Sequence, residues 1–279
     1  MAEPEVRTRT IPSSGERLPV VGLGTWSTFD AGASPAERRP LEEVLRRFQD
    51  LGGRLVDSSP MYGRAEGVLG DLATKLGVRD RLFLATKVWT SGKRAGQEQL
   101  EESTRLLRSP RLDLLQVHNL LDTNTQLATL RGWKAQGRVR YVGVTHYTSS
   151  AYADLARVLR REPLDFVQVN YSIVEPEAEA GILPLAADRG VAVIANRPFG
   201  GGGALRRLAN RPLPECAADL HYGSWSELFL NWILADPRVT CVIPATGRRE
   251  HLEANMRALR GSLPDAAQRR AIAEAARAA

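Results

Sequence analysis

The chain has 279 residues, of which 43% are hydrophobic and 25% are charged, and its formal net charge is +6. That length fits one α/β barrel, which runs to roughly 250 residues, as well as two smaller domains. The basic residues are spread along the chain without a long run and without interleaved aromatic residues, so a nucleic-acid-binding protein is not expected.

Cysteine spacing and the N-terminal sequence exclude several further classes. Cys216 and Cys241 lie far apart and outside any Cys-x-x-Cys motif, so neither a disulfide framework nor a zinc site is predicted. The N-terminus is polar and does not resemble a signal peptide. No apolar run is long enough to span a membrane. We therefore expect a cytoplasmic protein with no membrane partner and no metal.

The first elements predicted along the chain are a hairpin and a strand. Residues 7–11 and 17–20 flank the turn residues 12–15, which is the pattern of a β-hairpin. Residues 18–23 are apolar and predict the first strand of a barrel, with 24–26 as its exit loop. A capping box with proline at the first helical position, Ser-Pro-Ala-Glu at 34–37, then begins a helix.

After this helix, short apolar runs and helical patterns alternate to the end of the chain. The later strands are predicted at 54–57, 82–86, 112–117, 139–144, 166–169, 191–195 and 240–243. The helices are predicted at 34–51, 65–76, 97–107, 123–136, 149–160, 177–189, 224–235, 249–259 and 264–278. Strands separated by helices imply a parallel sheet. The sequence therefore predicts one domain over residues 1–279, a (β/α)8 TIM barrel with an extra C-terminal helix and a long loop at 197–223.

Four chemically distinctive residues follow successive predicted strands: Asp57, Tyr62, Lys87 and His118. The carboxyl ends of the strands open onto one face of a barrel, so these side chains are expected to converge. A buried lysine needs a carboxylate partner, which Asp57 can provide. The Lys87 ammonium would lower the pKa of Tyr62, and His118 would donate a hydrogen bond to a carbonyl oxygen. A hydride would have to come from a cofactor.

Each of these residues also has an ordinary structural interpretation. A single aspartate at the end of a strand often caps a helix, and a single lysine usually lies on the surface. A histidine in an apolar run is more often part of the core than a catalyst, and Tyr62 alone would be expected to pack. Four such residues at successive strand ends favour a catalytic site.

With these motifs, the chain resembles the aldo-keto reductase superfamily over nearly its whole length. The matching segments are residues 21–26, 56–63, 84–87, 115–118, 142–145, 167–171, 242–244 and 252–255. The five-residue spacing from Asp57 to Tyr62 and the order Asp, Tyr, Lys, His match the family's catalytic tetrad. The resemblance implies reduction of an aldehyde or ketone, with Tyr62 as general acid tuned by Lys87 and Asp57, and with His118 orienting the carbonyl.

The resemblance also implies a nicotinamide cofactor and the positions that bind it. These are Gly24, Thr25, Thr145, His146, Gln168, Asn196, Arg197, Pro198, Phe199, Gly200, Thr246 and Asn255, and Arg248 and Arg249 are added for their charge because Ala245 stands where the family often has a lysine. At residues 195–200 the family commonly has an aromatic ring that stacks on the nicotinamide, and this chain reads Ala-Asn-Arg-Pro-Phe-Gly. Arg248 and Arg249 could bind a 2′-phosphate, so NADPH is favoured over NADH. Their other interpretation is a charged start to an exposed helix.

Substrate contacts and partners are less constrained by the sequence. Trp26, Trp89 and Tyr147 follow barrel strands and are expected to line an apolar pocket for a small-molecule carbonyl substrate, although packing in the barrel is an equal interpretation. The glycines at 200–203 could cradle a pyrophosphate through their backbone N–H groups or act as a flexible hinge, and we favour a mixed role as a mobile flap that closes over the cofactor. We expect a monomer or a weak homo-oligomer.

Two alternative functions remain open at this point. Lys87 at a strand end could form a Schiff base, as in barrel lyases. The chain could also be a sensor or subunit that binds the nicotinamide cofactor with little turnover, which the missing stacking ring favours.

Overall fold

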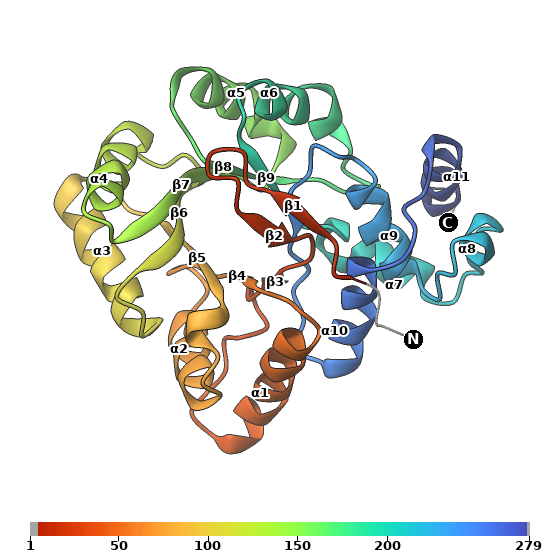
Figure 1. Ribbon diagram of the computed structural model, residues 1–279, viewed down its shortest axis with the longest axis horizontal. Helices are drawn as coiled ribbons and strands as arrows, with labels where there is room; N and C mark the ends of the chain where they lie inside the picture. The colour runs from red at the N-terminus through yellow and green to blue at the C-terminus, as the bar shows by residue number, and fades with distance from the viewer. Residues whose placement is uncertain (1–4, 278–279) are drawn as a thin grey trace.

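A parallel eight-stranded sheet forms the centre of the molecule (Figure 1), whose computed structural model describes residues 5–277. Its order follows the chain: β3 (Leu23–Gly24), β4 (Leu55–Asp57), β5 (Phe83–Val88), β6 (Leu112–His118), β7 (Val139–Thr145), β8 (Phe166–Asn170), β9 (Ala192–Asn196) and β10 (Cys241–Val242). The first and last strands meet, because Val21 bridges Val242 and Gly24 bridges Ala245. The sheet therefore closes into the predicted barrel.

Helices form a ring outside this barrel (Figure 1). They are α1 (Pro35–Asp50), α2 (Ala65–Lys75), α3 (Lys93–Leu106), α4 (Thr123–Ala135), α5 (Tyr152–Arg161), α6 (Ile182–Asp188), α9 (Trp225–Leu234) and α10 (Arg249–Met256). The capping box before α1 is confirmed, since the Ser34 hydroxyl accepts a hydrogen bond from the Glu37 amide. The predicted helix at 177–189 divides into a 3-10 turn, η3 (Glu177–Ala180), and α6, because the backbone at Gly181 is not helical.

The N-terminal hairpin covers one end of the barrel (Figure 1). Its strands β1 (Thr8–Thr10) and β2 (Arg17–Pro19) pair in antiparallel register. The buried side chains of Ile11 and Leu18 belong to one hydrophobic cluster with residues of the barrel, which are Leu55, Phe83, Ala85, Leu114, Tyr141, Phe166, Ala192, Ile194, Cys241 and Ile243. The hairpin thus closes the amino-terminal end and leaves the carboxyl ends of the strands open.

The prediction of a barrel strand at 18–23 is wrong in its first part. Residues 18 and 19 belong to β2, and the barrel strand is only Leu23–Gly24. The apolar run is continuous because both the hairpin residue Leu18 and the barrel residue Leu23 are fully buried. Burial alone therefore does not reveal where the chain leaves the hairpin.

The long loop predicted at 197–223 contains regular structure. Its elements are η4 (Gly200–Gly202), α7 (Gly203–Leu208) and α8 (Cys216–Asp219). Gly200, Gly201 and Gly202 all have positive φ angles, of 56°, 72° and 84°, which glycine adopts without strain. The helices are too short for a helical period to be read from the sequence.

The C-terminal helix α11 (Ala266–Arg277) confirms the predicted extra helix, and residue 278 of that prediction lies outside the described residues. Arg269 fixes it to the barrel. The Arg269 Nε donates to the Trp232 carbonyl at 3.0 Å, and its guanidinium lies 4.0 Å from the Trp232 ring centroid. The guanidinium also contacts Tyr171 Oη and the Glu179 carboxylate.

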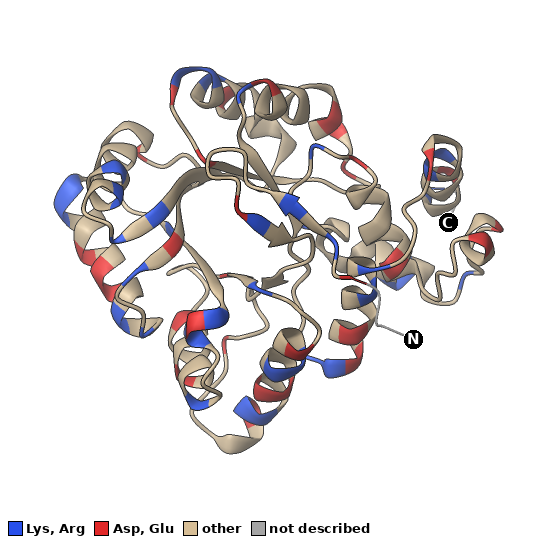
Figure 2. Cartoon of the chain, in the orientation of Figure 1, with Lys and Arg blue, Asp and Glu red and all other residues tan. Residues whose placement is uncertain are grey.

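Charged residues lie mainly on the outer helices, where acidic and basic positions are interleaved along the ribbon (Figure 2). This distribution is typical of a solvated, charged surface. Within residues 5–277, no helix is both long and apolar enough to cross a membrane.

Candidate active site

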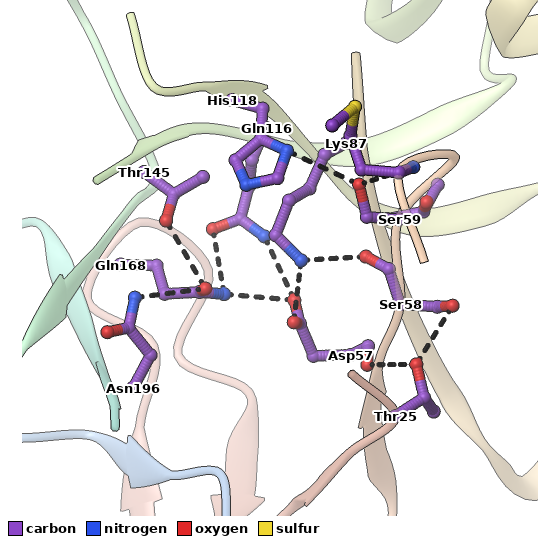
Figure 3. Close-up of polar contacts among 12 residues, drawn as sticks. Thr25, Asp57, Ser58, Ser59, Lys87, Gln116, His118, Thr145, Gln168 and Asn196 are labelled. Atoms are coloured by element: carbon purple, nitrogen blue, oxygen red, sulfur yellow. Dashed lines mark hydrogen bonds and ion pairs between the residues drawn. The ribbon is translucent and has the colours of Figure 1, made fainter. Parts of the chain in front are cut away.

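Lys87 lies at the centre of a buried polar cluster near the carboxyl ends of the strands (Figure 3). Its Nζ donates to Asp57 Oδ2 at 2.6 Å and to the Ser58 carbonyl oxygen at 2.7 Å. Burial by itself would lower the pKa of this ammonium, but its interactions with Asp57 and Tyr62 outweigh burial and raise it. Lys87 is therefore a buried cation at neutral pH, paired with the carboxylate that the sequence predicted.

The other carboxylate oxygen of Asp57 is held by two amides. Its Oδ1 accepts from Gln168 Nε2 at 2.9 Å and from Gln116 Nε2 at 3.3 Å. Gln116 was not among the predicted site residues. A signal for it exists, because it lies two residues before His118 in β6 and side chains two apart on a strand point to the same face.

Gln168 connects the Lys87–Asp57 ion pair to other side chains that were predicted to bind the cofactor (Figure 3). Its Oε1 accepts from Thr145 Oγ1 at 3.2 Å and from Asn196 Nδ2 at 3.3 Å. Asn196 Nδ2 also donates to the His146 carbonyl oxygen at 3.2 Å. These hydrogen bonds fix whether the oxygen or the nitrogen of each side-chain amide is directed at a given neighbour. They also join the side chains at the strand ends into one rigid wall.

Tyr62 and His118 lie beside Lys87. The Lys87 Nζ is 4.8 Å from the Tyr62 ring centroid. The rings of Tyr62 and His118 meet edge to face, with centroids 6.1 Å apart and an interplanar angle of 85°. The four residues of the predicted tetrad therefore converge.

The expected lowering of the Tyr62 pKa is outweighed in the free protein. Burial raises the pKa of the Tyr62 phenol, and the Lys87 charge lowers it only in part. Burial, and then the nearby charges of Lys87 and His146, lowers the pKa of His118 from its usual 6.5 to about 3. At neutral pH the site thus holds a protonated phenol, a neutral imidazole and an ammonium.

A cavity of about 580 Å³ opens over these residues. Asp57, Tyr62 and His118 line it, and Lys87 lies beneath the surface. The three predicted substrate residues also line it and are unusually exposed for aromatic residues: Trp26 by 59%, Trp89 by 38% and Tyr147 by 48%. A polar floor below an apolar, aromatic mouth is typical of a small-molecule site.

Eight of the predicted cofactor-binding residues line this cavity: Gly24, Thr25, Thr145, Gln168, Asn196, Arg197, Pro198 and Phe199. His146 and Gly200 do not line the cavity, although each is adjacent in the sequence to a residue that does. The glycines at 201 and 202 do line it.

The remaining four cofactor-binding predictions, at or near α10, do not line the cavity, although Thr246 directly follows the lining residue Ala245. Arg248 is the N-cap of α10, and its amide donates to Thr246 Oγ1 at 3.1 Å. Arg249 pairs with Glu253 at 3.0 Å, and Asn255 is buried near the end of the helix. The structure therefore divides the predictions into a group on the cavity wall and a group at α10.

Three buried polar atoms beside the cavity have no hydrogen-bond partner among the described residues. They are Asn119 Oδ1, Asn196 Oδ1 and Arg197 Nε, and all three residues line the cavity. Buried polar atoms are rarely left unpaired in native proteins. Asn119 was not predicted from the sequence. A ligand with polar groups along this wall, such as a nicotinamide nucleotide, fits the donors and acceptors present.

Comparisons with known proteins agree over nearly the whole chain. The sequence model described as the Aldo/keto reductase family matches residues 20–275. Methylglyoxal reductase YeaE of Escherichia coli K12 is 29% identical over 270 residues, which covers 94% of this chain and 93% of that protein.

Solved structures give the same agreement in three dimensions. An aldo-keto reductase of Klebsiella pneumoniae in complex with NADP and acetate has a TM-score of 0.80 and 26% identity, and the match covers 99% of this chain and 95% of that one. An aldo-keto reductase from the same organism in complex with NADPH also has a TM-score of 0.80 and 26% identity, covering 100% and 95%.

Proposed function

The chain belongs to the aldo/keto reductase family, and from this we propose that it is an NADPH-dependent oxidoreductase that reduces an aldehyde or ketone to an alcohol. The observation that carries this proposal is the buried Lys87–Asp57 pair beside a protonated Tyr62 and a neutral His118, below an aromatic-lined cavity. The named relatives agree with it, since one is a methylglyoxal reductase and two were solved with NADP or NADPH.

Tyr62 is the proposed proton donor. Its phenol is protonated at neutral pH, so it can give its proton to the carbonyl oxygen as negative charge develops there. The phenolate that results lies next to the Lys87 ammonium, which stabilises it. Asp57 keeps that ammonium charged and in place. His118, which is neutral, orients the carbonyl oxygen by hydrogen bonding.

The cavity wall is the proposed site for the nicotinamide end of the cofactor, which when bound supplies the hydride to the carbonyl carbon. Thr145, Gln168 and Asn196 present amide and hydroxyl groups there, and the unpaired Asn196 Oδ1 leaves an acceptor to be satisfied. Arg248 and Arg249 have mostly exposed side chains, which we propose bind the 2′-phosphate of NADPH.

The Schiff-base alternative has less support from the structure. Its nucleophile would be Lys87, whose Nζ is fully buried, donates to two oxygens and has a raised pKa. A protonated amine is not a nucleophile. The sensor alternative keeps one supporting observation, which is the amide of Asn196 in place of a stacking ring.

We further propose a small-molecule carbonyl substrate, a cytoplasmic location, one domain, and a monomer or a weak homo-oligomer. The exposed aromatic side chains at the cavity mouth support an apolar or aromatic substituent on the substrate.

Nucleotide titration followed by turnover tests the proposal. Trp26 and Trp89 line the cavity, so protein fluorescence is expected to change when NADPH binds there. Oxidation of NADPH is then followed with a panel of aromatic aldehydes and methylglyoxal, with Tyr62→Phe as the matched variant that keeps the ring and loses the proton. Binding with turnover that Tyr62→Phe abolishes supports the reductase. Absence of nucleotide binding would contradict it, and binding without turnover in either protein would favour the sensor.

A further inference from the structure

Ser59 is a buried residue that the proposed chemistry has not yet used. It follows Asp57 by two residues in the turn after β4, and it is fully buried. Its Oγ lies 3.3 Å from His118 Nδ1 (Figure 3). Ser59 is not among the residues that line the cavity, so it acts on a ligand only through His118.

The hydrogen bonds of Ser59 determine the direction of this contact. Its Oγ accepts a hydrogen bond from the Met61 amide at 3.2 Å. Among the described residues, the other polar contact of Oγ is His118 Nδ1. If Nδ1 carried the proton, it would donate to Oγ, and the buried hydroxyl hydrogen would have no acceptor. If Nδ1 is unprotonated, the hydroxyl donates to it and every group is satisfied, which is the favoured arrangement for buried polar groups.

The other ring nitrogen then carries the proton. His118 is mostly buried next to the Lys87 ammonium, so its imidazole is neutral and has one N–H. We propose that Ser59 is a positioning residue that fixes His118 as the Nε2–H tautomer, which makes its cavity-side nitrogen a hydrogen-bond donor to an uncharged acceptor such as a carbonyl oxygen. The role of that acceptor rests on the proposed function, whereas the tautomer does not.

The same serine links the hydrogen-bond donor to the proton donor. Its backbone oxygen accepts from the Tyr62 amide at 3.0 Å, so one turn holds both Tyr62 and the contact to His118. His118 itself comes from the end of β6, a different strand. Ser59 therefore sets the orientation of the imidazole relative to the phenol as well as the position of its proton.

Nitrogen NMR of histidine-labelled protein tests the tautomer directly. The chain has four histidines, so four imidazoles are to be distinguished, and His118→Asn identifies the signals of His118. At pH 7 we expect the Nδ1 of His118 at the shift of an unprotonated nitrogen and Nε2 at that of a protonated one. In Ser59→Ala the two shifts should move toward each other, as the tautomers mix. Ser59→Thr keeps the hydroxyl and should restore the wild-type pattern.

A matched control separates the hydroxyl from the general effect of a Ser→Ala change in this turn. Ser58 precedes Ser59, is equally buried, and its Oγ contacts Thr25 instead of His118. Ser58→Ala should leave both His118 nitrogen shifts unchanged. A protonated Nδ1 in the wild-type protein, or identical shifts in wild type and Ser59→Ala, would overturn the proposal.

Kinetics give a second, separable readout. A donor aimed at the carbonyl oxygen matters most when that oxygen becomes negative in the transition state. Ser59→Ala should therefore lower kcat roughly tenfold and change the NADPH Kd little. The loss in kcat is smaller than the roughly 10²–10³-fold loss seen when such a donor is removed outright, because the imidazole is still present. Ser59→Thr should recover most of kcat. A protein that reduces no carbonyl but shows the expected NMR shifts would refute the proposed function and still support the tautomer assignment.

Discussion

The Lys87 ammonium and the Asp57 carboxylate form a 2.6 Å ion pair in which both side chains are almost completely removed from solvent. Asp57→Asn should leave that ammonium buried without a counter-charge and lower the free energy of unfolding by about 3 kcal/mol, since breaking a buried pair typically costs 3–5 kcal/mol. The charge that stabilises the Tyr62 phenolate would also be lost in part, so reductase activity should fall. Urea unfolding and initial rates measure the two effects.

Asp154→Asn is the matched control for this change. Asp154 pairs with Arg157 at 2.7 Å on an exposed face of α5, and solvent screens such a pair. The free energy of unfolding should barely change. A similar loss in both variants would mean that burial of the Lys87–Asp57 pair is unimportant for stability.

His118 should make the protein less stable as the pH falls below neutral. Its pKa is about 3 when folded and 6.5 in the unfolded reference, so between these values the unfolded chain binds more protons. The stability contribution is complete above pH 6.5 and is lost as the pH falls through 6.5 toward 3. At pH 5 the loss should be about 2 kcal/mol, from 1.36 kcal/mol per pKa unit.

His118→Asn should remove that part of the pH dependence. The difference in unfolding free energy between pH 7 and pH 5, measured with urea, should be smaller in the variant by about 2 kcal/mol. Equal pH dependence in the two proteins would show that the imidazole is not kept neutral by burial. Comparing the two proteins cancels the contribution of His146, whose pKa burial also lowers.

Arg248 and Arg249 should discriminate between the two nicotinamide nucleotides. Changing both to Ala removes the proposed charge partners of the 2′-phosphate, so the Kd for NADPH should rise roughly tenfold or more, while NADH, which lacks that phosphate, binds almost as before. Fluorescence titration measures both constants. Arg160 and Arg161, exposed at the end of α5, give a control with the same loss of charge. An equal loss of affinity for both nucleotides would refute the 2′-phosphate role.

Arg269 should be required for docking of α11. Arg269→Ala removes the hydrogen bond to the Trp232 carbonyl and leaves the Glu179 carboxylate without its cation, so the free energy of unfolding should fall by about 2 kcal/mol. Proteolysis near the C-terminus should also become faster. Arg270, the exposed neighbour, provides a control whose change to Ala should affect neither measurement.

The barrel and the convergence of Asp57, Tyr62, Lys87 and His118 could be predicted because both depend on local patterns. Runs such as 82–86 are buried on both faces and are followed by helices of readable period, so the strand–helix repeat appears in the chain itself. Lys87 and Asp57 stand at the ends of such runs. The topology then brings them together, since all carboxyl ends of a parallel barrel meet at one face.

Other features depended on contacts between distant segments. The sequence pattern predicts Leu18 as part of a barrel strand, but Leu18 belongs to the hairpin and packs into the barrel from there. An apolar residue is buried in either position, so the pattern does not distinguish the two. The short helices in 203–219 are stabilised by packing and have too few turns for a sequence period. Ser59 and Gln116 are ordinary polar residues in the sequence, and only their neighbours give them a role.

The amino-acid sequence by itself determined the parallel barrel, the order of its units and the residue types at the strand ends, because periodicity and burial act over a few neighbouring residues. The tertiary structure decided the protonation states and the partners within the site. Lys87 would lower the pKa of Tyr62 and burial raises it, and the balance depends on how completely the surrounding chain excludes water. The hydrogen bond between Ser59 and His118 depends in the same way on bringing together the turn after β4 and the end of β6, because the two residues are 59 positions apart in the sequence.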